Sequence, residues 1–141
     1  MRPLFLLLTC LILWTSCQKQ TSKTITTTTL IETTKSWNGN LLPKIEGQPK
    51  VTITKIVIPP KTKLPNHLHP VITTGILLKG ELTVTTAQGE QTILREGDAL
   101  VEVSNTLHYG ENTGNTDIEI VVFYIGGEHQ PLTILASSEQ P

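Results

Sequence analysis

Two histidines separated by one residue are the feature of this sequence best suited to chemistry. If residues 67–69 are extended, the side chains of His67 and His69 project to the same side of the chain. Two neutral imidazoles placed in this way can bind one transition-metal ion, provided that a third ligand comes from elsewhere. The alternative is a pair of exposed histidines that bind nothing.

The apolar pattern predicts that strands position these histidines. From residue 51 onward, apolar residues form short runs or alternate with polar ones, and no stretch repeats with the period of a helix. The runs are 51–53, 56–58, 76–78, 82–84, 93–94, 100–103, 118–124 and 132–135. Because turn-forming residues separate them, we expect an all-β antiparallel sandwich or barrel, with 81–86 and 91–94 forming a hairpin whose tip is exposed.

Two blocks of residues resemble the paired motifs of the cupin family in their order and spacing. The matching residues are His67, His69 and Gly80 in the first block, in which Thr73 occupies a further motif position, and Gly97, His108 and Asn112 in the second. The resemblance implies a jelly-roll β-barrel made of an antiparallel double sheet. It also implies that His67, His69 and His108 bind one divalent metal ion, which is Fe, Mn, Zn, Ni or Cu.

The sequence departs from the family pattern at Thr73, where many members carry a glutamate as fourth metal ligand. A neutral hydroxyl is a poor ligand, so we expect a three-histidine site with open positions for water or substrate. Three neutral ligands leave the charge of the ion uncompensated, which favours ionised water and anionic ligands. Glu102 restores a carboxylate if it points inward, and is otherwise solvated. The family also contains barrels without metal.

Glu102 and Tyr109 are the candidate catalytic residues beside the ion, although a tyrosine on a strand also suits packing at the barrel edge. Trp37 is expected to close a barrel end, and His129 to be exposed in a loop. The resemblance is compatible with a mononuclear oxygenase, dioxygenase-like, or with an isomerase-like enzyme acting on a small, anionic molecule. It is equally compatible with a non-catalytic module that binds a small molecule or metal at the cell envelope.

The first 16 residues are expected to be a signal peptide, because Arg2 precedes an apolar run from Leu4 to Trp14. Cleavage before Cys17 resembles the processing of a bacterial lipoprotein, in which a lipid on that cysteine anchors the protein to the membrane. Since Trp14 stands where such signals usually have leucine, an unlipidated secreted product is the alternative. We expect a secreted protein of the cell envelope or periplasm, and Gln18 favours the outer membrane if the lipid is present.

The remaining segments are a linker at 17–35, a cupin domain at 36–136 and a disordered tail at 137–141. Threonine dominates the linker, which we expect to be extended, and its part from Thr24 to Thr34 could supply an exchanged strand in a homodimer. The net charge of −1 gives no electrostatic basis for binding nucleic acid. Cys10 and Cys17 both belong to the signal region, so the folded part contains no thiol.

Overall fold

The computed structural model describes residues 24–137, which contain ten β-strands. They are β1 (Pro49–Ile58), β2 (Thr62–Lys63), β3 (His67–Leu68), β4 (Ile72–Lys79), β5 (Glu81–Thr86), β6 (Gln91–Arg95), β7 (Ala99–Val101), β8 (His108–Asn112), β9 (Ile118–Gly127) and β10 (Ile134–Leu135). Within this range, we find no helix with the length and apolar character needed to cross a membrane.

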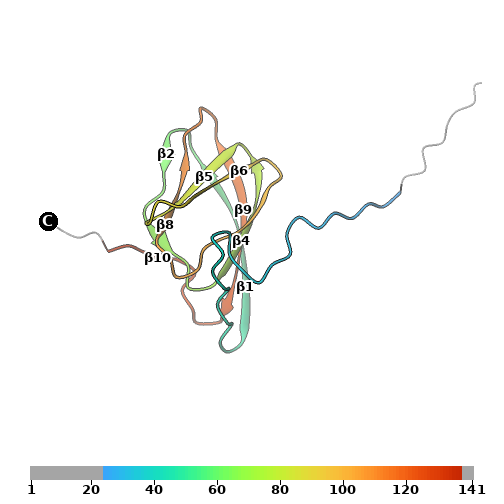
Figure 1. Cartoon of the computed structure of the whole chain (residues 1–141), viewed down its shortest axis with the longest axis vertical. Helices are drawn as coiled ribbons and strands as arrows, with labels where there is room; N and C mark the ends of the chain where they lie inside the picture. The colour runs from blue at the N-terminus through green and yellow to red at the C-terminus, as the bar shows by residue number, and fades with distance from the viewer. Residues whose placement is uncertain (1–23, 138–141) are drawn as a thin grey trace, which may run out of the picture.

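The strands form two antiparallel sheets that face each other (Figure 1). The first has the order β1-β9-β4-β7, and the second has the order β10-β3-β8-β5-β6, with β2 also paired to β8. Along β9, buried and partly buried residues alternate, because successive side chains of a strand point to opposite faces. The all-β jelly-roll fold predicted from the sequence is therefore confirmed.

The core lies between the two sheets and is built mainly from aliphatic side chains. Its largest fully buried members include Ile58, Leu77, Val84 and Ile118. The predicted hairpin is confirmed, since β5 pairs with β6 from Glu81↔Arg95 to Thr85↔Gln91. The predicted strands 51–53 and 56–58 are one continuous strand, β1, which pairs with β9 over its whole length.

Gly80 lies where the chain crosses from the first sheet, at β4, to the second, at β5. Its φ of 89° is in the left-handed region, which side chains disfavour. A Cβ atom added there would lie 2.9 Å from Cγ1 of Ile118. Glycine is therefore required both by the backbone conformation and by the close packing of β9, which accounts for its place in the motif.

The segment before the barrel is extended and makes few contacts with it. Residues 24–34 form no strand and are exposed, and Figure 1 shows this segment, in blue, running away from the barrel. The segment joins the barrel at Trp37, whose backbone N–H donates to the carbonyl of Val101 over 2.9 Å. The expected signal peptide, Cys17 with its expected lipid, and residues 138–141 of the expected tail lie outside the described residues.

Candidate metal centre

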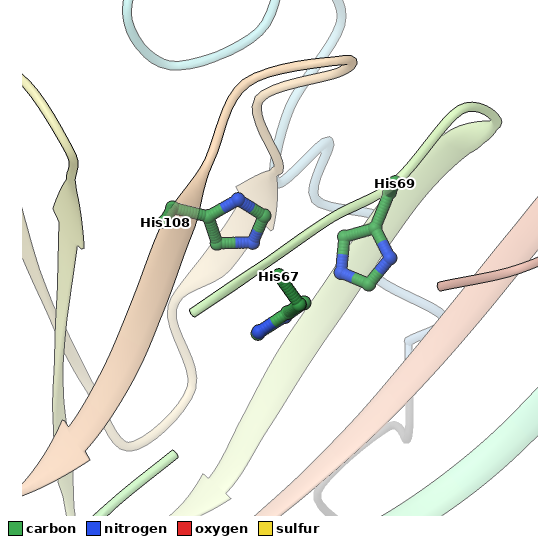
Figure 2. Close-up of side chains that lie close together, drawn as sticks. All are labelled: His67, His69 and His108. Atoms are coloured by element: carbon green, nitrogen blue, oxygen red, sulfur yellow. The ribbon is translucent and has the colours of Figure 1, made fainter. Parts of the chain in front are cut away.

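Three histidines from two distant parts of the chain meet inside the barrel. His67 in β3 pairs directly with His108 in β8, and His69 forms a bridge with Ser104 just beyond β3. The ring centroids are 4.5 to 5.2 Å apart. One ring nitrogen from each histidine lies within 4.8 Å of the other two, and Figure 2 shows the rings gathered at one place. This group could hold a metal ion.

Backbone carbonyl groups fix the orientation of all three imidazoles. Nδ1 lies 2.8 Å from the carbonyl oxygen of Pro65 in His67, of Leu132 in His69 and of Thr106 in His108. A carbonyl oxygen only accepts hydrogen bonds, so each Nδ1 carries the proton and donates it. Nε2 of each ring is then left with a free lone pair. This tautomer is the one that a metal site formed by Nε2 atoms requires.

Burial also favours the neutral form of these imidazoles. It lowers the pKa of His67, against the opposing effect of the hydrogen bond to Pro65. For His69, burial lowers the pKa to about 4. Both rings are therefore neutral at neutral pH in the metal-free protein, and neither must lose a proton before its Nε2 binds an ion.

Thr73, in place of the glutamate of the family, lies beside the histidines in the interior. Its side chain is 3% exposed, and its hydroxyl donates to the carbonyl oxygen of Val71 at 3.5 Å. The site therefore receives no negative charge from this position.

Glu102 does point inward, which was one of the two alternatives for this residue. Its Oε1 lies 3.9 Å from Nε2 of His108, and the side chain is 13% exposed. The same oxygen accepts hydrogen bonds of 3.1 Å from Nε1 of Trp37 and from the backbone N–H of Val103. A carboxylate therefore lies beside the histidines, and Trp37 contacts the site through it.

Tyr109 does not reach the site, in contrast to its suggested role as a catalytic group. It follows His108 on a regular strand, so the alternation of side chains turns it to the other face of the sheet. There Nζ of Lys63 lies 3.6 Å from the centre of its ring. His129 is exposed in the loop after β9, as expected.

Tyr124 is a residue of the site that the sequence patterns did not identify. It lies on β9 opposite Thr73, it is 8% exposed, and its ring centroid is 5.5 Å from that of His69. Burial raises the pKa of its hydroxyl, which therefore stays protonated and able to donate. Tyr124 could have been recognised from the sequence, because it follows Ile120 and Val122 at every second position of one strand and so points inward with them.

The histidines lie at a cavity of about 80 Å³. Its polar lining consists of the three histidines, Thr73, Glu102 and the Tyr124 side chain, and the remaining wall is mostly aliphatic. Among the described residues that line it there is no lysine or arginine. The cavity therefore accepts a small molecule, and its protein wall supplies no permanent positive charge.

Comparison with solved structures shows the same fold in several other proteins. Oxalate oxidase in complex with the substrate analogue glycolate matches with 23% identity and a TM-score of 0.52, over 61% of this chain and 46% of that one. The DMSP lyase DddQ from Ruegeria pomeroyi matches with 20% identity and a TM-score of 0.54, over 64% and 45%. A cupin-like protein from Thermotoga maritima matches with 17% identity and a TM-score of 0.56, over 64% and 67%.

These similarities concern the fold, because the identities are low and the chain spans less than half the length of the first two proteins. No curated protein matches the sequence. The model of the cupin domain matches residues 54–124, which is half of the chain and includes all three histidines. The protein therefore belongs to the cupin family.

Proposed function

We propose that this protein is a metal-dependent cupin in which His67, His69 and His108 hold one divalent ion. The observation that carries this proposal is the gathering of three histidines whose ligand nitrogens lie within 4.8 Å of one another, while Nδ1 of each ring is hydrogen-bonded to a backbone carbonyl and Nε2 is left for an ion. Imidazole ligands suit Fe, Mn, Zn, Ni and Cu. When bound, such an ion binds a donor atom of the ligand and increases the acidity of bound water.

The cavity defines the kind of molecule that we propose as ligand. Its volume of about 80 Å³ is smaller than the roughly 150 Å³ of an apolar protein cavity that takes up benzene. An anionic ligand would depend on the ion for its positive partner, and Glu102 would oppose a second negative charge. We therefore propose a small molecule with at most one anionic group, held at the ion, and with its apolar part against the aliphatic wall.

Catalysis is the function that we put first, and capture without turnover is the second. The inward carboxylate of Glu102 supports catalysis, because it places beside the histidines a group that either binds the ion or accepts a proton from the ligand. The mostly aliphatic wall supports capture. The named activities of oxalate oxidase and DMSP lyase illustrate chemistry on small molecules in this fold, and an oxygenase or isomerase-like reaction is our proposal here.

Metal reconstitution followed by activity assays tests this proposal. The metal-free protein is loaded with Fe²⁺, Mn²⁺, Zn²⁺, Ni²⁺ or Cu²⁺, and oxygen uptake and product formation are measured with small monocarboxylates, thiols, diketones and phenols. Turnover that requires the ion and is absent from His69→Ala supports catalysis. Saturable binding of a compound that is recovered unchanged with every ion supports capture instead.

We also propose that the protein acts at the cell envelope, either released after cleavage or held by a lipid on Cys17. The apolar run that ends at Trp14 and the cysteine that follows it support this location. Intact mass of the protein from membrane and soluble fractions tests it. A mass that starts at Cys17 with added acyl chains supports the anchor, an unmodified mass from that region supports secretion, and retention of Met1 contradicts both.

A further inference from the structure

We propose that Glu102 supplies the fourth metal ligand that Thr73 does not, and that Trp37 positions the carboxylate for this role. This inference rests on the proposed three-histidine site. The backbone N–H of Glu102 donates to the carbonyl oxygen of Thr73 over 2.8 Å, so the two residues are direct neighbours on adjacent segments. Both side chains line the same cavity. Thr73 offers no carboxylate, and Glu102 on the adjacent segment offers one to the same cavity.

The distances place Glu102 within reach of an ion bound by the histidines. Ligand atoms that lie about 2.1 Å from one ion are about 3.0 to 3.5 Å apart in tetrahedral or octahedral geometry. Oε1 of Glu102 lies 3.9 Å from Nε2 of His108, and the histidine nitrogens lie within 4.8 Å of one another. These distances are longer than the bonded ones, so the carboxylate and the rings must turn inward when an ion binds, and Oε2, the second oxygen of the same carboxylate, then becomes the ligand atom.

Glu102 is also the only acidic side chain among the described residues that line the cavity. It is 13% exposed, and its contact with an ionisable basic group in the described structure is with His108. A divalent ion held by the histidines would give this carboxylate a cationic partner, which neutral imidazoles do not supply.

The hydrogen bond from Trp37 leaves one of the two carboxylate oxygens of Glu102 free to bind an ion. Its indole N–H and the backbone N–H of Val103 both donate to Oε1. Within residues 24–137, the other oxygen, Oε2, accepts no hydrogen bond from the protein. Trp37 is itself fixed by the hydrogen bond of its backbone N–H to Val101. The indole thus restrains the side chain of Glu102 at the cavity while one oxygen remains free to bind.

Metal affinity measured with Co²⁺ tests the ligand role. We expect Glu102→Gln to weaken binding by more than about 100-fold, beyond the 10- to 100-fold effect typical of a group that only hydrogen-bonds a ligand. The matched control is Glu111→Gln, because Glu111 lies on the outer face of β8 and its substitution should leave affinity unchanged. The double variant Thr73→Glu/Glu102→Gln should recover affinity to within about tenfold of the parent, because it returns the carboxylate to the adjacent segment.

An NMR measurement of the Trp37 indole N–H tests the role of Trp37. In the full chain carrying Trp14→Phe, Trp37 is the remaining tryptophan, so its indole N–H signal is identified directly. Binding of Zn²⁺ should shift this signal in the presence of Glu102 and leave it nearly unchanged in Glu102→Gln at saturating Zn²⁺. If Glu102→Gln does not fold, Glu102→Asp serves in both experiments, with a smaller loss of affinity.

The outcomes separate this inference from the proposed function. If the parent binds Co²⁺, His69→Ala does not, and Glu102→Gln binds as the parent does, the three-histidine site stands and the role of Glu102 is contradicted. An indole signal that does not respond to Zn²⁺ contradicts the role of Trp37. A parent that binds neither ion contradicts both proposals.

Discussion

His67 and His108 face each other directly across β3 and β8, with their ring centroids 4.5 Å apart. β8 is held on its other side by β5, where His108 pairs with Thr86. The two ligands are therefore placed by the register of a sheet, and sites built on strands hold their geometry better than sites built on loops. The third histidine, His69, is held by the hydrogen bond to Leu132 near the end of the chain.

Asn112 is predicted to stabilise the barrel without contributing to the metal site. Its side chain is 1% exposed, its Nδ2 donates to the carbonyls of Ile58, Pro59 and Thr116, and its Oδ1 accepts from Gly114. Asn112→Ala should lower the free energy of unfolding by about 2 to 4 kcal/mol, because buried carbonyl groups lose their donors. Denaturant unfolding measures this loss.

The exposed Asn115, three residues further along, provides the matched control. Asn115→Ala should change the unfolding free energy by less than about 0.5 kcal/mol. Equal effects of the two substitutions would contradict the structural role of Asn112, and a loss of metal affinity in folded Asn112→Ala would place it in the site.

Acid should destabilise the metal-free protein through His69. The pKa of this residue is about 4 in the folded state, lowered by burial, and 6.5 in its reference state. The unfolded chain thus binds the proton more tightly, so the contribution of His69 is complete above pH 6.5 and is lost as the pH falls toward 4. Over that window the loss is about 3 kcal/mol.

Urea unfolding of the metal-free protein between pH 7.5 and pH 4 measures this dependence. His69→Gln should reduce the slope, whereas His129→Gln, at an exposed loop position, should keep the slope of the parent. A His69→Gln protein with an undiminished slope would show that other groups cause the acid sensitivity.

The size of the cavity should limit which carboxylates reach the ion. In the Co²⁺-loaded protein we expect acetate to change the optical spectrum at lower concentration than benzoate, because the cavity is smaller than one that holds benzene. Val122→Ala enlarges the cavity and should bring the concentration of benzoate that changes the spectrum closer to that of acetate. Val121→Ala removes a side chain from the opposite face of β9 and should not. Tighter binding of benzoate by the parent would contradict this account.

A homodimer is the assembly that we propose for the exposed segment 24–34. Two of its apolar side chains are exposed among the described residues, Leu30 to 58% and Ile31 to 45%. The edge strand β1 likewise exposes Val51 and Ile53, and such an edge can accept a strand from a second copy. Leu30→Asp/Ile31→Asp should convert a dimer into a monomer in light scattering, whereas Thr27→Asp/Thr28→Asp should have a smaller effect. A monomeric parent would contradict the proposal.

Local rules and the family motifs were sufficient to predict the fold and the histidines. The one-residue spacing of His67 and His69 places both on one side of an extended chain, and the second motif points to His108. The position of Tyr109 could also have been derived, because a residue next to an inward ligand on a regular strand points outward.

The orientation of Glu102 could not be predicted in the same way. Between it and His108 the chain turns through Asn105, whose φ of 51° is in the left-handed region, so the alternation of side chains cannot be followed across this turn. The contact with Trp37 joins residues 65 positions apart. It depends on how the segment before β1 packs against the barrel, which no local pattern records.

Metal content after reconstitution and removal of free ions tests most directly whether the three histidines bind an ion. We expect one divalent ion per chain in the parent and in His129→Ala, and almost none in folded His69→Ala or His108→Ala. Equal metal content in the parent and in either of the last two variants would contradict the claim that three imidazoles share one ion inside this barrel.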